Sequence, residues 1–337
     1  MISQVLLQLM KGQSLTRSEA SALMDRVFAG EATSAQVAAV LTALHVKGET
    51  PEEVAGFADA MRAHAEAFPS VGQGVDTCGT GGDRAGTYNL STTVSFIAAG
   101  AGVKVAKHGG RSASSKTGGA DVLEALGVDI EMAPETAARC LDRVGMTFLF
   151  AQRYHPAMRH VAPVRRELGV PTVFNVLGPL CNPSKPSRQV LGVYRPELVD
   201  LVSQALLELG ATHAMVVHGL SGLDELTLDG PTLVAELKHG SIRRYEVHPH
   251  DVGLAEAPIS ALAGGDAAEN AQIIRDVLSG VDRGPKRDAA LLNAAATLMV
   301  GGNVDSLRDG VALARESLDS GRALAKLDDL VKESRLS

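Results

Sequence analysis

The sequence predicts an α/β fold: a small N-terminal helical domain, then a larger α/β domain with a mostly parallel central sheet. In the first 66 residues, apolar side chains recur at helical spacing between clear helix ends. After residue 74, short apolar runs alternate with helical segments. Strands that alternate with helices pair in parallel through right-handed crossovers. We therefore expect a helical domain over 1–66, a linker over 67–74 and an α/β domain over 74–337.

The N-terminal helices have strong local signals. Thr16 and Glu19 form a predicted capping box, and Gly30 lies where that helix should end. Thr50 and Glu53 repeat the box, with Pro51 at the first helical position.

In the rest of the chain, strands are expected around 75–77, 103–106, 146–150 and 214–217. The intervening helices are expected at 91–101, 121–126, 157–168 and 198–209. Residues 232–247 predict an antiparallel hairpin, and the chain returns to helices from residue 270.

Composition excludes several classes of protein. A net charge of −7 and only 7 Phe, 4 Tyr and no Trp argue against a nucleic-acid-binding surface. The 3 cysteines are far apart and form no metal-ligand spacing, so we expect reduced thiols and a cytoplasmic protein. The N-terminus does not resemble a signal peptide, and no apolar run is long enough to span a membrane.

A glycine-rich loop, Gly79-Thr80-Gly81-Gly82-Asp83, follows the first predicted strand. Glycines allow backbone N–H groups to approach an anion, so the loop can form a nest for phosphate. Neither a Walker lysine nor the dinucleotide-binding spacing is present. Asn89 and Ser91 then begin a predicted helix, where either could be a simple N-cap. Because a helix start also attracts anions, the two features together favour phosphate binding.

A second glycine-rich loop spans residues 104–121 and carries cations, hydroxyls and four glycines. It follows a predicted strand, where open α/β sheets place their ligands. A solvated surface loop is the alternative, but the cations favour a phosphate-bearing ligand.

Asp224 and Glu225 lie just past another predicted strand, where adjacent carboxylates on a loop can both reach metal ions. Mg²⁺ uses few protein oxygens and completes its shell with water and phosphates, so the pair suits Mg²⁺ as well as it suits a polar surface loop.

The segment from residue 154 to 169 mixes basic residues into a helix that Gly169 ends. One of Arg159, Arg165 and Arg166 could clamp a carboxylate in a bidentate manner, but spacing cannot choose among them.

Taken together, these motifs resemble the anthranilate phosphoribosyltransferase family over nearly the whole chain. The resemblance rests on GTGGD at 79–83, NLST at 89–92, KHG at 107–109 and GADVLEALG at 119–127. It also rests on residues 153–183, Asp224-Glu225, DVGL at 251–254 and GGDAAENA at 264–271. It implies a nucleoside phosphorylase/phosphoribosyltransferase-like fold in which part of 160–183 joins the helical domain. It also implies a homodimer, two Mg²⁺ ions per subunit, and anthranilate and 5-phosphoribosyl diphosphate as substrates.

The resemblance also implies roles for single residues. Lys107, Asp83 and Arg165 would act in catalysis, and Arg165 would engage the anthranilate carboxylate. Ser91, Asp224 and Glu225 would hold metal. The expected substrate-binding residues are Gly79, Gly82, Asp83, Thr87, Asn89, Ser91, Thr92, Lys107, His108, Gly109, Gly110, Arg111, Ser115, Gly119, His155 and Arg165.

Two positions depart from the family pattern: Gly110 stands where the family usually has Asn, and Gly119 where it often has Ser. Because the family Asn contacts anthranilate, Gly110 puts acceptor affinity in question. The alternatives are a pyrimidine nucleoside phosphorylase of similar fold, which has no obligatory Mg²⁺, and a non-catalytic relative that binds nucleic acid.

Overall fold

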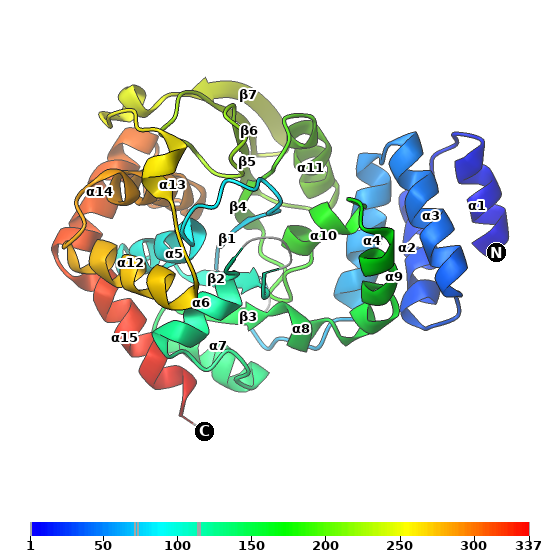
Figure 1. Cartoon of the computed structure of the whole chain (residues 1–337), viewed down its shortest axis with the longest axis horizontal. Helices are drawn as coiled ribbons and strands as arrows, with labels where there is room; N and C mark the ends of the chain where they lie inside the picture. The colour runs from blue at the N-terminus through cyan, green and yellow to red at the C-terminus, as the bar shows by residue number, and fades with distance from the viewer. Residues whose placement is uncertain (1, 71, 73, 113–115, 337) are drawn as a thin grey trace.

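A computed structural model describes residues 2–70, 72, 74–112 and 116–336. Its first four helices are α1 (Ile2–Met10), α2 (Arg17–Phe28), α3 (Ser34–Lys47) and α4 (Pro51–Ala63). Both predicted capping boxes are confirmed, at the starts of α2 and α4. A third, between Thr33 and Gln36, begins α3. These helices form the lobe on the right of Figure 1.

Five strands form the central sheet in the order β1-β4-β5-β6-β7. Their bounds are β1 (Asp76–Gly79), β4 (Arg188–Gly192), β5 (His213–Gly219), β6 (Thr232–Lys238) and β7 (Ser241–Val247). The β1–β4 and β4–β5 pairs are parallel, whereas β5–β6 and β6–β7 are antiparallel. The expected hairpin over 232–247 is therefore confirmed.

The sequence reading missed β4. A second, two-stranded parallel sheet pairs β2 (Val105–Gly109) with β3 (Met146–Phe150). A single parallel bridge between Val75 and Val105 connects it to the start of β1. The carboxyl ends of β1, β2, β4 and β5 thus lead into loops on one side of the molecule.

The remaining α-helices connect and cover the strands. They are α5 (Leu90–Gly100), α6 (Gly119–Leu126), α7 (Pro134–Arg143), α8 (Ala151–Tyr154), α9 (Ala162–Leu168), α10 (Phe174–Leu180), α11 (Glu197–Glu208), α12 (Ala267–Ser279), α13 (Pro285–Gly301), α14 (Leu307–Asp319) and α15 (Arg322–Ser334). Short 3₁₀ turns span Pro156–His160, Pro249–Val252 and Ile259–Leu262. Among the described residues, no helix combines the length and apolar character needed to cross a membrane.

The single helix expected over 157–168 is wrong. The segment is a 3₁₀ turn over Pro156–His160, followed by α9 from Ala162. Pro163 lies in the first turn of α9 and has no N–H to donate backward, so it suits a helix start and not a helix interior. Gly169 does end α9, with a left-handed φ of 63°.

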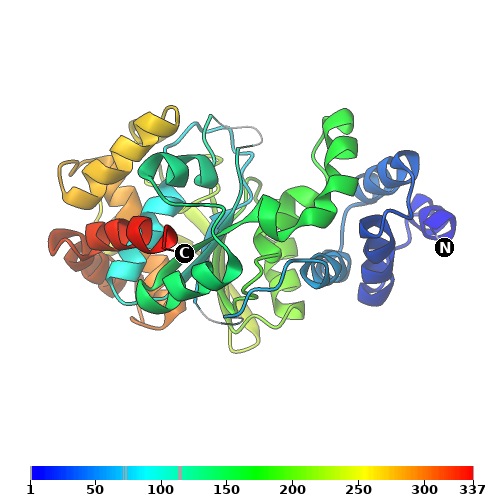
Figure 2. The same cartoon turned by 90° about the horizontal axis from the view of Figure 1, so that it is seen from below.

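Two hydrophobic clusters lie on the two faces of the central sheet. One contains Val190, Met215 and Val217 and packs under α5, α6, α7 and α12–α15. The other contains Leu191, Ala214 and Val216, together with α1–α4, α11 and residues 161–181. Successive strand residues point to opposite faces, so β4 and β5 contribute to both clusters. Figure 2 shows α9 and α10 lying between the N-terminal helices and the sheet.

Candidate functional site

The loop after β1 packs directly against the acidic loop after β5. The Gly81 N–H donates to Asp224 Oδ2 at 2.7 Å. A Cβ atom at Gly79 would overlap the Asp224 carboxylate, and one at Gly192 would overlap the Asp224 backbone. Three loops from neighbouring strands therefore meet closely, and only glycine permits the approach.

The GTGGD loop has the backbone of an anion nest. Gly81 and Gly82 have φ angles of 66° and 87°, and both residues are exposed. Exposed backbone N–H groups in a turn of this kind can bind an anion, and the Gly81 N–H is used by Asp224 in this structure. Tyr194, just after β4, supports the loop: its ring lies beside Gly82, and its N–H donates to Thr80 Oγ1 at 3.2 Å.

Lys107, on β2, points into the space between this loop and α5. Its Nζ donates to the Thr77 carbonyl at 2.6 Å and to Ser91 Oγ at 3.0 Å. The residue is only 3% exposed. Burial lowers the pKa of Lys107, and the nearby acids Asp76, Glu225 and Asp224 oppose that shift. The site thus holds one buried cation beside the predicted phosphate loop.

The start of α5 is not closed by a side-chain cap. Asn89 occupies the N-cap position, but its side chain makes no capping hydrogen bond. Nearby, Thr92 Oγ1 is buried and has no hydrogen-bond partner among the described residues. A Cβ atom at Gly119 would lie 3.8 Å from both Thr92 Oγ1 and Lys107 Cε. Asn89 is thus the N-cap residue by position, as the simple-cap interpretation expects, but it supplies no capping bond. The helix start, the Thr92 hydroxyl and Lys107 surround one place suited to an anion.

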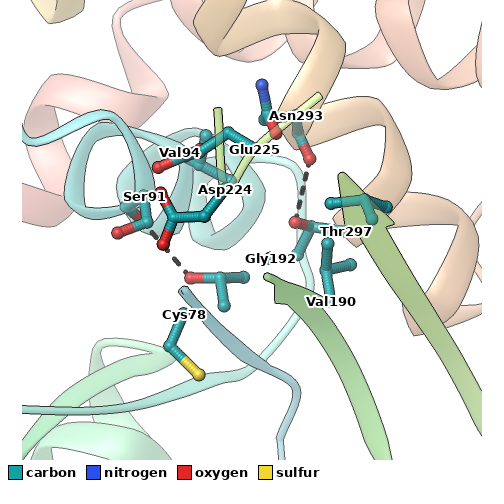
Figure 3. Close-up of a pocket in the computed structure, with 11 residues that line it drawn as sticks. Cys78, Ser91, Val94, Val190, Gly192, Asp224, Glu225, Asn293 and Thr297 are labelled. Carbon is teal, nitrogen blue, oxygen red and sulfur yellow. Dashed lines mark hydrogen bonds between the residues drawn. The ribbon is translucent and has the colours of Figure 1, made fainter. Parts of the chain in front are cut away.

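Asp224 and Glu225 are half-buried, and their carboxylates face Ser91 (Figure 3). Burial and the neighbouring Asp83 raise the pKa of Asp224 to about 7. Burial and Asp224 raise the pKa of Glu225 well above its usual range, although Lys107 and the Ser91 N–H oppose the shift. Negative charge is therefore in excess here.

A magnesium ion suits this group of oxygen donors. A divalent cation would relieve the excess charge, and the Asp224 and Glu225 carboxylates with the Ser91 hydroxyl are the hard oxygens that Mg²⁺ prefers. The described residues contain no group of three or more His, Cys, Asp and Glu side chains arranged around one point. A metal here would thus rely on few protein ligands, as Mg²⁺ does when phosphates complete its shell.

Beneath the two acids lies a cavity of about 20 Å³, drawn in Figure 3, with room for roughly one water molecule. It is too small for a substrate, but it shows how the acids are held. Asn293, on α13, accepts from the Leu226 N–H at 3.0 Å and donates to the Leu226 carbonyl at 2.8 Å. Asn293 is 4% exposed, so a buried amide fixes the residue that follows Glu225.

The second half of the predicted site lies across α10. His108 and His155 are buried with ring centroids 5.2 Å apart. His108 Nε2 and both nitrogens of His155 have no hydrogen-bond partner. Burial lowers the pKa of His108 well below its usual range and that of His155 to about 4, so both rings are neutral at pH 7. His108 Nδ1 lies 3.2 Å from the carbonyl of Gly178 on α10.

Arg165 approaches the other end of α10. Its guanidinium lies 5.4 Å from the ring centroid of Phe174, the first residue of that helix. Arg165 is half-buried, whereas Arg159 and Arg166 are exposed. Burial lowers the pKa of Arg165, and no acid offsets that effect. Of the three arginines, only Arg165 therefore presents a sheltered, unpaired cation.

The remaining predicted substrate-binding residues differ in their contacts. Thr87 forms a backbone bridge with Ala263, next to Asn89. A Cβ atom at Gly110 would lie 3.1 Å from Gln152 Oε1, and one at Gly109 would contact Phe148. Arg111 is exposed and already pairs with Asp121 and Glu124 at 2.9 and 2.8 Å, so its charge is engaged elsewhere. Ser115 lies outside the described residues.

Sequence reasoning overlooked Tyr194, Gly192 and Asn293. The first two follow or end β4, which the sequence did not reveal. Asn293 lies in the middle of an apolar helix. A single polar residue within that apolar run is the sequence feature that could have indicated a buried hydrogen-bonding role.

Comparisons with known proteins agree with this geometry. The helical bundle domain of the glycosyl transferase family matches residues 3–65, and the a/b domain of that family matches residues 71–324. An anthranilate phosphoribosyltransferase of Roseiflexus castenholzii is 54% identical over 100% of this chain and 99% of its own length.

Solved structures give the same result. The anthranilate phosphoribosyltransferase of Thermus thermophilus has a TM-score of 0.92 at 46% identity, covering 98% of this chain and 99% of its own. The enzyme of Saccharomyces cerevisiae in complex with PRPP and Mg has a TM-score of 0.87 at 30% identity, covering 98% of each chain. With two family domains along its length and relatives similar from end to end, this chain belongs to the anthranilate phosphoribosyltransferase family.

Proposed function

We propose that the chain transfers the phosphoribosyl group of 5-phosphoribosyl diphosphate to the amine of anthranilate. The products are N-(5-phosphoribosyl)anthranilate and diphosphate, within tryptophan biosynthesis. The observation that carries the proposal is the meeting of the GTGGD nest, Lys107 and the Asp224-Glu225 pair at one edge of the sheet. The likeness to the yeast enzyme in complex with PRPP and Mg supports it.

The donor would bind along the loops after β1 and β2. The nest would receive the diphosphate through its N–H groups, and the Lys107 ammonium would add a charge-assisted hydrogen bond. Thr92 has an unused hydroxyl for the same ligand. The expected contacts are Gly79, Gly82, Asp83, Thr87, Asn89, Ser91, Thr92, Lys107, Gly109, Arg111, Ser115 and Gly119.

Ser91, Asp224 and Glu225 would hold Mg²⁺, with two ions per subunit. When bound, Mg²⁺ supplies positive charge that stabilises the leaving diphosphate. The ammonium of Lys107 would stabilise the negative charge of the same diphosphate. The carboxylates must lose their protons to bind metal. Asp83 raises the pKa values of both acids and so opposes that loss, whereas Lys107 lowers the pKa of Glu225 and favours it.

The acceptor would bind on the side of α10. Arg165 would clamp the anthranilate carboxylate, while His108, His155 and Gly110 would line its path. In the reaction the C1–O bond to diphosphate breaks, the amine nitrogen forms the C1–N bond, and the amine then loses one proton. An aromatic amine is neutral at pH 7, so a strong general base is not required before attack. Orientation of the amine and exclusion of water are the remaining tasks of the protein.

The test is a double substitution, Asp224→Asn with Glu225→Gln, which keeps side-chain size and removes both charges. We expect turnover to fall by at least about a hundredfold and the Mg²⁺ dependence to change. Initial rates come from the loss of anthranilate fluorescence, with and without 5-phosphoribosyl diphosphate and Mg²⁺. Unchanged turnover and an unchanged metal response would remove the metal assignment. A wild-type protein that consumes no anthranilate would remove the proposed reaction.

We also propose a cytoplasmic homodimer formed through the helical lobe. Three large apolar side chains on α1 and α3 are exposed: Leu7 at 57%, Met10 at 69% and Val46 at 80%. Exposed apolar groups on neighbouring helices are typical of a contact surface. Light scattering should give a dimer for the wild type and a monomer for a Met10→Glu, Val46→Glu variant. Free thiols at Cys78, Cys140 and Cys181 support a reducing compartment.

A further inference from the structure

The GGDAAENA motif, which the proposed chemistry does not use, ends in a buried side chain next to the predicted donor site. Asn270 lies in the first turn of α12 and is 2% exposed. Its Oδ1 accepts from the Gly265 N–H at 2.7 Å, and its Nδ2 donates to Asn89 Oδ1 at 2.9 Å. A helix near the C-terminus therefore contacts the residue that begins α5.

Asn270 is one member of a closed ring of hydrogen bonds. Asn89 Nδ2 donates onward to the Thr117 carbonyl at 3.1 Å. Thr117 Oγ1 donates to the Gly265 carbonyl at 3.0 Å, which returns the ring to the segment where it began. The ring joins the start of α5, the glycine-rich loop after β2 and the loop before α12.

The direction of the ring is fixed by backbone groups. The Gly265 N–H can only donate, so Asn270 must turn its oxygen toward Gly265 and its NH₂ group toward Asn89. The Thr117 carbonyl can only accept, so Asn89 must turn its NH₂ group toward Thr117. The Asn89 amide then has a single orientation, with one N–H and one oxygen lone pair left for a ligand.

The ring also ties together segments that are rich in glycine. Gly109 ends β2, Gly119 begins α6, and Gly110 and Gly118 lie between the two elements; glycine backbones lose the most freedom on ordering. Backbone bonds from Tyr88 N–H to the Leu262 carbonyl and from Gly264 N–H to the Gly86 carbonyl align the other two segments. Two side-chain contacts extend this alignment to residue 117: Asn89 Nδ2 donates to the Thr117 carbonyl, and Thr117 Oγ1 donates to the Gly265 carbonyl.

We propose that Asn270 is a positioning residue for the donor site, which acts through Asn89. It fixes the Asn89 amide and, through Asn89, ties Thr117 to the start of α5. The proposal rests on the proposed reaction and on Asn89 contacting the phosphoribosyl diphosphate. Asn270 itself touches neither substrate.

Two substitutions separate positioning from folding. Asn270→Ala removes both hydrogen bonds, whereas Asn270→Asp keeps the acceptor that Gly265 uses, loses the donor aimed at Asn89 and adds a negative charge. The alanine variant, which adds no charge, controls for that last change. We expect both variants to raise the KM for 5-phosphoribosyl diphosphate about tenfold, with the KM for anthranilate changed less than about twofold. Gln272→Ala, which truncates an exposed amide on the same helix, is the matched control and should behave as wild type.

A double-mutant cycle tests whether the effect passes through Asn89. In an Asn89→Ala background, adding Asn270→Ala should change the donor KM less than about twofold, because the contact is already lost. Three results would overturn the proposal: an Asn270→Asp variant with wild-type donor KM, equal changes in both KM values, or a full tenfold effect in the Asn89→Ala background. Wild-type turnover is measured alongside, so absence of the reaction itself is distinguished from failure of this inference.

Discussion

Replacing Arg165 by alanine should weaken anthranilate binding far more than donor binding. The guanidinium is half-buried over Phe174, its pKa is lowered by burial, and no acid offsets that effect, so its charge is unused without a ligand. Hydrogen bonds to charged groups contribute about 1.5–3 kcal/mol. At 1.4 kcal/mol per factor of ten, the loss of a bidentate clamp corresponds to a KM for anthranilate raised roughly 10- to 150-fold.

The assay is the initial rate of anthranilate fluorescence loss, with each substrate varied in turn. Arg165→Lys should recover only part of the loss, since an ammonium neither forms a two-pronged bond nor stacks as well on Phe174. Arg166→Ala, at the exposed neighbouring position, is the control and should leave both KM values unchanged. Equal increases in both KM values, or full recovery with lysine, would refute a carboxylate clamp at Arg165.

Three further predictions follow from the packing and the charges. Gly192→Ala forces a Cβ atom into the Asp224 backbone, so kcat should fall at least about tenfold while circular dichroism stays native; wild-type kcat would contradict the packing argument. In the metal-free protein the pKa of Asp224 is raised to about 7, so its protonated form stabilises the fold below that pH and the contribution is lost as pH rises through 7. The affinity for Mg²⁺ should therefore fall as pH drops below 7, and Mg²⁺ binding should release protons. Calorimetry in buffers of different ionisation enthalpy measures that release. Binding without proton release would contradict the prediction. Glu53→Ala removes a fully buried carboxylate that pairs with Lys47 at 2.9 Å and accepts from the Leu15 N–H. The free energy of unfolding in urea titrations should fall by about 3 kcal/mol, with kcat unchanged. A loss below about 1 kcal/mol would argue that the Glu53–Lys47 pair does not stabilise the fold.

Local chemistry explains what could be predicted from the sequence. The boxes Thr16–Glu19 and Thr50–Glu53 depend on residues three apart, so they are visible before any tertiary contact is known. The prediction that Asp224 and Glu225 hold metal depends on two adjacent acids that follow an apolar strand. The prediction that the glycine-rich loops bind phosphate depends on the many glycines that follow a strand.

Long-range contacts explain what could not be predicted. β4 begins with Arg188 and Gln189, so it lacks the apolar run of its neighbours. Asn89 looks like an N-cap, but its side chain is used by Asn270, 181 residues further along. Nothing near either asparagine indicates that pairing.

The anchoring of the acidic loop by Asn293 has a consequence for synthesis of the chain. Leu226, next to Glu225, is fixed from a residue 67 positions later. A ribosome releases the strands of the central sheet well before it releases α13, and domains fold as they emerge. The nascent chain therefore carries both carboxylates for some time without the amide that sets their position. The loop that carries Asp224 and Glu225 should therefore reach its final geometry only after translation has passed α13.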